Sequence, residues 1–193
     1  RADLITDRCY QTCVNLEHAT LPGMKDRTVM CNSLSKTYSI TGWRLGYVCA
    51  PAYVMDRVRK VHDFLTVGAA APLQEAVIAG LELPDSYYQG VRDLFTHRKN
   101  IFCKGLDEIG LKYYEPQGTY FVMVDIGEFG YESDYDFCID LARDVKVGAV
   151  PGSSFFKEPV NNYIRLHFAK SDETLHEALN NLSKIREIIK VKK

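Results

Sequence analysis

A single lysine, Lys36, stands among small hydroxyl residues in the segment Asn32-Ser-Leu-Ser-Lys-Thr-Tyr-Ser-Ile-Thr-Gly-Trp-Arg-Leu-Gly-Tyr47. An amine in such surroundings suits attack on a carbonyl group. Arg44 follows between Gly42 and Gly46, and an arginine suits an oxyanion that must be held still. Together the two side chains indicate a phosphorylated aldehyde, bound covalently at one end and by charge at the other.

The composition is that of an ordinary globular chain. Of its 193 residues, 46% are hydrophobic and 25% are charged, and the length fits one large domain or two small ones. The formal net charge of -1 indicates no general attraction to nucleic acid or to an anionic membrane surface. No apolar run approaches the roughly 20 residues that a bilayer span needs. We therefore expect no nucleic-acid partner and no membrane partner.

The six cysteines are scattered along the chain and form no CxxC pair. Cys9 and Cys13 with His18 lack a fourth ligand at a suitable spacing, so we expect no metal site. Buried free thiols are the usual state of such cysteines inside cells. The expected setting is therefore reducing and cytoplasmic.

Two short strands are expected on either side of Lys36. Residues 28–31 form an apolar run that ends in Asn32-Ser33, and residues 44–50 form a second run, ended by Pro51. In open α/β sheets ligands gather at the carboxyl ends of strands, so the first strand would deliver Lys36 to a binding site. Helical spacing follows over residues 52–66 and 73–81.

The remainder of the chain has a regular order of elements. We expect a long helix that Gly110 ends, two strands, a helix over residues 134–144, two more strands, and a last helix capped by Ser171. The last helix carries one apolar stripe, formed by Leu175, Leu179, Leu182, Ile185 and Ile189. This order predicts a compact α+β domain with its own core.

The motifs, taken together, resemble those of class I/II, fold type I aminotransferases, which use pyridoxal 5'-phosphate (PLP). Ser33-Leu-Ser-Lys36 through Gly42-Trp-Arg44-Leu-Gly46 is similar to the cofactor-lysine signature of that family. The similarity covers essentially the whole chain in order, through Thr6-Asp7-Arg-Cys-Tyr10, Pro116-Gln-Gly118, Val150-Pro-Gly152 and Tyr163-Ile-Arg165-Leu-His-Phe168. It corresponds to roughly the C-terminal half of a family member.

The resemblance implies an α/β fold in two parts. Residues 1–83 would be the C-terminal part of a truncated large PLP-binding domain, and residues 84–193 a complete small C-terminal α+β domain. It also implies a homodimer for the full-length protein, in which the partner subunit contributes to the site. This chain alone, a fragment, is expected to be inactive and to bind the cofactor poorly.

Roles for the lysine loop follow from the same resemblance. Lys36 would bond covalently to the cofactor and then act as the general base that moves the substrate proton. Arg44 would hold the cofactor phosphate as a planar double donor. Ser33 would donate its hydroxyl to the same phosphate. Ser35 offers a similar hydroxyl, and either serine also suits a simple turn.

Three further residues complete the implied site. Asp7 would lie against the pyridine nitrogen and keep the ring protonated, and Tyr10 would hydrogen-bond the 3-oxygen of the ring. Arg165 would bind the substrate carboxylate through a bidentate fork. Position 8 is an arginine where the family commonly carries an acidic residue. The implied substrates are an amino acid and a 2-oxo acid.

Two other functions are compatible with these residues. A PLP-dependent lyase or synthase on the same fold, such as a C–S lyase or a cyclopropane-forming synthase, would use the same catalytic set. A non-catalytic binding module would keep the motif only as a scaffold. The transfer of an amino group between an amino acid and a 2-oxo acid is the function that we predict for the full-length protein.

Overall fold

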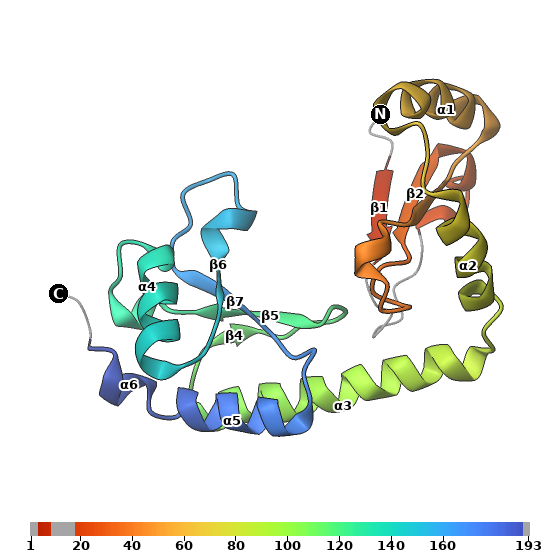
Figure 1. The fold of residues 1–193 in the computed structure, drawn as a ribbon. Helices are drawn as coiled ribbons and strands as arrows, with labels where there is room; N and C mark the ends of the chain where they lie inside the picture. The colour runs from red at the N-terminus through yellow and green to blue at the C-terminus, as the bar shows by residue number, and fades with distance from the viewer. Residues whose placement is uncertain (1–3, 9–17, 191–193) are drawn as a thin grey trace. The chain divides into compact units, whose positions relative to one another are not determined.

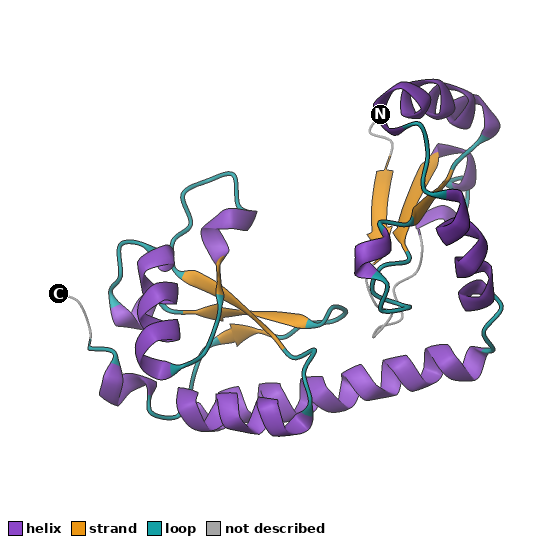
Figure 2. Cartoon of the chain, in the orientation of Figure 1, coloured by secondary structure: helices purple, strands orange, loops and turns teal. Residues whose placement is uncertain are grey.

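The computed structural model describes residues 4–8 and 18–190, and it divides the chain into two compact units, Arg1–Arg92 and Asp93–Lys193 (Figure 1). Both units mix helices and strands (Figure 2). The division falls inside a long helix, whereas the sequence placed the domain boundary between residues 83 and 84. The assignment of the two parts to a large and a small domain stays a prediction.

The first unit is built on a three-stranded sheet in the order β1-β2-β3. β1 (Leu4–Arg8) runs parallel to β2 (Thr28–Ser33), and β3 (Gly46–Cys49) runs antiparallel to β2. α1 (Ala52–Thr66) and α2 (Ala71–Leu81) follow. The predicted strands on either side of Lys36 and the two predicted helices are therefore confirmed.

The buried cluster of the first unit is small. It consists of Leu34, Leu45 and Val77, with Tyr38, Ile40 and Leu73 packed against it. The cluster joins the loop after β2 to α2, so the loop is seated on that helix. α1 has no buried residue, and Phe64 on this helix is 91% exposed.

The second unit contains a four-stranded antiparallel sheet in the order β4-β5-β7-β6, entered by the long helix α3 (Asp85–Ile109). The remaining elements are β4 (Tyr113–Tyr114), β5 (Phe121–Asp125), α4 (Asp134–Asp140), β6 (Val150–Pro151), β7 (Tyr163–His167), α5 (Asp172–Leu182) and α6 (Ile185–Ile188). The predicted order of elements is confirmed. Gly110 ends α3 at a φ of 75°, as the sequence predicted.

The core of the second unit follows the alternation of its strands. Val122 and Val124 on β5, and Ile164 and Leu166 on β7, are buried on one face of the sheet, while Arg165 lies on the other face. α3 and α5 pack closely, because a Cβ on Gly105 would meet the side chain of Leu179. The two helices lie side by side in Figure 1.

Two helices of this unit differ from the sequence expectation. The helix from Asp134 is α-helical only to Asp140 and continues as a π turn over Leu141–Val145. The last helix is interrupted after Leu182, where the Ser183 hydroxyl donates to the Asn180 carbonyl at 2.8 Å and the Lys184 amide donates to the Asn181 carbonyl, three residues back, at 3.2 Å. All five residues of the predicted apolar stripe are nevertheless buried.

The caps agree with the expectation. Ser171 precedes α5, and its Oγ accepts a hydrogen bond from the Thr174 amide at 3.4 Å. Asp172 and Glu173 occupy the first turn, where negative charge is favourable. None of the helices in the described part of the chain combines the length and the apolar character that a membrane span requires.

Candidate active site

Lys36 lies in the turn that directly follows β2. Two backbone hydrogen bonds shape this turn, from the Tyr38 amide to the Leu34 carbonyl at 3.4 Å and from the Ser39 amide to the Lys36 carbonyl at 3.2 Å. Lys36 is half-buried, whereas the two residues before it, Leu34 and Ser35, are buried. The buried Leu34 therefore anchors the turn and leaves the lysine at its surface.

Ser33 and Arg44 are brought to the same end of the sheet by strand pairing. Ser33 pairs with Gly46, and the Leu34 amide donates to the Leu45 carbonyl at 3.1 Å. The Oγ of Ser33 accepts a hydrogen bond from the Ser35 amide at 3.2 Å. Ser33 thus ends β2 and also shapes the turn, and because a hydroxyl that accepts one hydrogen bond can still donate another, both roles considered from the sequence are compatible.

Arg44 has an unusual backbone for a residue with a side chain. Its φ of 56° places it in the left-handed region, and its guanidinium donates to the Thr41 carbonyl at 2.9 Å. Such a conformation costs free energy in a non-glycine residue and persists where the surrounding structure imposes it. The side chain is exposed, so the remaining guanidinium donors are accessible to an anion.

The two glycines of the signature have different environments. A Cβ on Gly46 would lie 2.7 Å from the Asn32 carbonyl oxygen, so the β2–β3 pairing requires glycine here. A Cβ on Gly42 would meet nothing within 4 Å. Close packing of the strands therefore explains Gly46 but not Gly42.

Three tyrosines that the sequence reasoning missed, Tyr38, Tyr87 and Tyr88, form a cluster that contacts the lysine turn. The Tyr87 hydroxyl donates to the carbonyl of Thr37, next to Lys36, at 2.7 Å, and the hydroxyls of Tyr38 and Tyr88 lie 2.7 Å apart. Burial raises the pKa of Tyr38, and the hydrogen bond with Tyr88 raises it further. The adjacent Tyr87-Tyr88 pair near the start of α3 is a signal that sequence reasoning could have used.

Asp7 lies on β1, and Tyr10 lies outside the described residues. Asp7 pairs with Cys31 of β2, and because the two strands are parallel their carboxyl ends meet at one edge of the sheet. Asp7 is therefore placed on the strand next to the one that delivers Lys36. Its role and that of Tyr10 stay predictions.

Arg165 belongs to the second unit and lies between aromatic rings. Its guanidinium carbon is 4.1 Å from the centre of the Phe155 ring and 4.8 Å from the centre of the Phe121 ring. His167 lies on the same strand face, and burial of its ring lowers its pKa, with a smaller contribution from the charges of Lys170 and Arg165. The sequence reasoning did not identify either phenylalanine.

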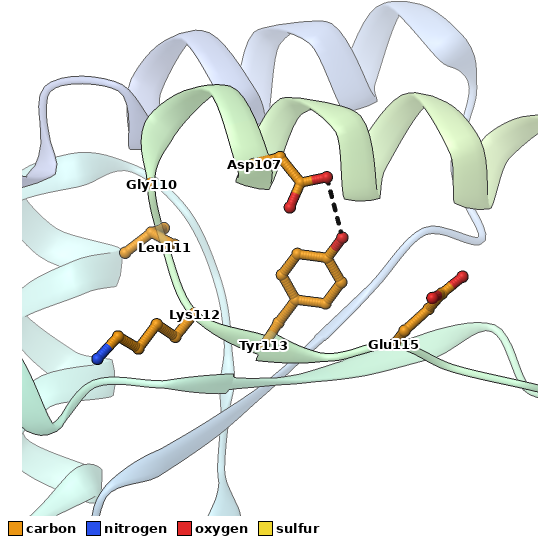
Figure 3. A pocket seen from close by; sticks show the side chains of 6 residues that line it. All are labelled: Asp107, Gly110, Leu111, Lys112, Tyr113 and Glu115. Carbon is orange, nitrogen blue, oxygen red and sulfur yellow. Dashed lines mark hydrogen bonds between the residues drawn. The ribbon is translucent and has the colours of Figure 1, made fainter.

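One surface hollow of the second unit involves none of the predicted site residues. Figure 3 shows it beside the end of α3, with a volume of about 460 Å³. Its lining residues are Asp107, Gly110, Leu111, Lys112, Tyr113 and Glu115. The Tyr113 hydroxyl donates to the Asp107 carboxylate across it at 3.2 Å. Within the described ranges, no group of three His, Cys, Asp or Glu residues could hold a metal ion.

The chain belongs to the family of class I and II aminotransferases, which matches residues 2–182. This match confirms the family that the lysine signature indicated.

Curated relatives and solved structures agree with this assignment. The chain is 33% identical to a probable N-succinyldiaminopimelate aminotransferase of Mycobacterium tuberculosis, over 95% of this chain and 50% of the relative. It is also 33% identical to the methionine aminotransferase of Escherichia coli, over 94% and 49%.

The crystal structure of YbdL from Escherichia coli, described as having a methionine aminotransferase function, superposes with a TM-score of 0.85 at 32% identity, over 93% of this chain and 49% of that one. The predicted fold class is confirmed by this likeness. The chain spans about half the length of the relatives that it matches.

Proposed function

We propose that this chain carries the catalytic lysine and the anion-binding side chains of a PLP-dependent aminotransferase. The observation that carries the proposal is the lysine turn, in which strand pairing brings Ser33 and Arg44 to the sheet end where Lys36 emerges. An amine, a hydroxyl and a guanidinium gathered there match an aldehyde that bears a phosphate. Membership of the aminotransferase family supports the same assignment.

Each residue would do one part of the work. The Arg44 fork and the Ser33 hydroxyl would hold the phosphate, and Lys36 would bond to the aldehyde carbon. Once substrate has displaced it, the Lys36 amine would take the proton from the substrate α-carbon and return it at a different carbon. Asp7 and Tyr10 would lie at the ring nitrogen and the 3-oxygen. When bound, PLP supplies the electron sink for this proton transfer.

Arg165 would recognise the carboxylate that amino acids and 2-oxo acids share. A planar guanidinium offers two parallel N–H donors to a carboxylate, and this geometry serves both substrates of an amino transfer. The whole enzyme would thus move an amino group from an amino acid to a 2-oxo acid in two half-reactions.

The first experiment tests whether Lys36 bonds to the cofactor. PLP is added to the full-length protein, the absorbance in the near-ultraviolet and visible range is recorded, and the adduct is reduced with borohydride and mapped by peptide mass. We expect a new band and labelling of Lys36, both lost in Lys36→Ala. Lys60→Ala, on the exposed face of α1, is the matched control and should keep both. Labelling spread evenly over lysines, with no dependence on Lys36, would contradict the proposal.

A second experiment tests the reaction type. The PLP-loaded full-length protein is incubated with an amino acid and 2-oxoglutarate, and glutamate is measured. Formation of glutamate supports amino transfer. Release of pyruvate and ammonia without glutamate would instead identify a lyase with the same catalytic residues.

We also propose that the whole enzyme is a cytoplasmic homodimer. The apolar side chains along α1, where Phe64 is 91% and Leu65 75% exposed, are suited to contact with further polypeptide. Among the described residues, Cys31, Cys49, Cys103 and Cys138 are free thiols, as is usual in a reducing compartment. Sedimentation of the purified full-length protein tests the dimer.

A further inference from the structure

The guanidinium of Arg165 is held by ring contacts alone within the described part of the chain. Its central carbon lies over the rings of Phe155 and Phe121, and no hydrogen bond or ion pair joins it to a described residue. Aromatic faces attract a cation through the ring quadrupole without using its N–H donors. The in-plane edge of the guanidinium therefore keeps its donors for an incoming group.

The strand register explains the contact with Phe121. Arg165 pairs directly with Met123, and Phe121 pairs with His167, so Phe121 is the diagonal neighbour of Arg165 on the same face of the antiparallel pair. Diagonal neighbours on one face lie within reach of long and aromatic side chains. The sheet itself thus fixes the first ring.

The contact with Phe155 depends on a turn that is fixed from two sides. Phe155 ends the 3-10 turn Gly152–Phe155, which directly follows β6. On one side, a Cβ on Gly152 would lie 2.5 Å from the Tyr163 carbonyl oxygen, so the turn lies tightly against β7. The turn therefore has little freedom to move away from Arg165.

A buried carboxylate fixes the turn from the other side. Asp134, at the start of α4, is 2% exposed, and it accepts hydrogen bonds from the Ser153 amide at 2.7 Å and the Ser153 hydroxyl at 2.8 Å. Charge-assisted bonds of this length in a buried setting are strong and strictly directional. Asp134 thus holds the residue two positions before Phe155.

We propose that Phe121 and Phe155 are positioning residues for Arg165, and that Asp134 secures Phe155 through Ser153. The proposal rests on the proposed role of Arg165 in binding the substrate carboxylate. Ring contacts on the guanidinium restrict its rotamers before the substrate arrives, so less freedom is lost on binding. The two rings would thereby raise the affinity for a carboxylate without touching it.

The test uses the 193-residue chain and 3-phenylpropionate as the probe, because this carboxylate has no amino group and cannot enter the lysine chemistry. The Arg165 Nε–H signal is followed by NMR, and the neutral 3-phenylpropanol serves as the control probe. We expect Phe155→Leu to remove the ring-current shift of that signal and to weaken 3-phenylpropionate binding about fivefold. Phe155→Tyr keeps a ring and should retain both.

Phe156→Leu is the matched control for Phe155→Leu. The two phenylalanines are adjacent and similarly exposed, at 48% and 45%, but Phe156 contacts Tyr163 and not Arg165. Its replacement should leave the Arg165 signal and the affinity unchanged. Equal effects of Phe155→Leu and Phe156→Leu would overturn the proposal.

Ser153→Ala tests whether Asp134 secures Phe155, without deleting a buried charge. It removes one of the two hydrogen bonds to Asp134 and should weaken 3-phenylpropionate binding about twofold to threefold, in the same direction as Phe155→Leu. Binding of 3-phenylpropionate that is unaffected by Phe155→Leu overturns the positioning role alone. A wild-type chain that does not bind it through Arg165, as judged with Arg165→Lys, overturns the carboxylate role as well.

Discussion

The unit that carries Lys36 and the unit that carries Arg165 are stabilised in different ways. Around Lys36, three buried apolar residues and a set of tyrosine hydrogen bonds hold the loop, and α1 buries none of its side chains. In the unit that carries Arg165, many buried apolar residues from the sheet and the helices form the core, on the face of the sheet opposite Arg165. The first unit therefore depends on a small apolar cluster and local polar contacts, while the second unit depends mainly on apolar burial.

The largest expected difference concerns phenylalanines in the two units. Phe137 on α4 is fully buried, so Phe137→Ala should lower the free energy of unfolding by about 3–5 kcal/mol. Phe64→Ala on α1 should change it by less than about 0.5 kcal/mol, because the ring is exposed. Urea denaturation, monitored through amide exchange in each unit, measures the free energy of unfolding of both variants. Similar losses for the two variants would contradict the comparison.

The second largest expected difference between the units is the reactivity of their thiols. Burial raises the pKa of Cys138 to about 11, with a further contribution from the charge of Asp134, so at pH 8 only about one Cys138 in a thousand is a thiolate. Cys49 in the first unit is exposed. We expect iodoacetamide to label Cys49 at least about 100-fold faster, as measured by peptide mass over time, with Cys49→Ser as the control.

The same shift fixes the sign of a pH dependence. Folding keeps the Cys138 thiol protonated above its usual pKa of 9.0, so its contribution to stability is present below pH 9 and is lost as the pH rises toward 11. Cys138→Ser should flatten this alkaline loss in urea denaturation. A loss of equal size in the variant would show that another group causes it.

Replacing the two glycines of the lysine signature tests how closely β2 and β3 pair in the first unit. Gly46→Ala introduces a Cβ 2.7 Å from the Asn32 carbonyl oxygen and should destabilise the first unit by about 2 kcal/mol. Gly42→Ala meets no atom within 4 Å and should change stability by less than about 0.5 kcal/mol. Thermal unfolding of the two variants, compared with the parent chain, gives the difference. An unaffected Gly46→Ala protein would argue against close pairing of β2 and β3.

The smallest expected effect comes from one phenolic hydroxyl. Tyr87→Phe removes the hydrogen bond to the Thr37 carbonyl and should cost about 1 kcal/mol, seen as faster amide exchange in residues 34–45. Tyr114→Phe removes a hydroxyl from an exposed tyrosine pair in the second unit and should leave exchange in the lysine turn unchanged. If the amides of the lysine turn exchange as slowly in Tyr87→Phe as in the parent chain, the Tyr87 hydrogen bond does not stabilise the turn.

The elements that the sequence predicted well are those with a local chemical cause. Gly110 ends α3 and Ser171 caps α5 because the backbone at those points needs a left-handed residue and a side-chain acceptor. The lysine loop was likewise predicted from residue types within one short segment.

The features that the sequence left open depend on distant partners. The periodicity of α1 predicts a helix, but it cannot show that Phe64 is exposed, because burial depends on what packs against the helix. The contact of Phe155 with Arg165 joins a turn to a strand. It depends on the pairing of β6, which precedes the turn, with β7, and the spacing along the chain does not encode it. The π turn after Asp140 was not predicted either, because no glycine or proline marks it in the sequence.

The only tryptophan of the chain, Trp43, lies beside Arg44 in the turn Thr41–Trp43 and is 37% exposed. Tryptophan fluorescence therefore comes from the first unit alone. The second unit contains no tryptophan and does not contribute when tryptophan is excited selectively. Quenching or a spectral shift of this single fluorophore would follow an anion arriving at Arg44 in real time, with no label attached. The chain thus carries a built-in optical reporter at the phosphate end of its proposed site.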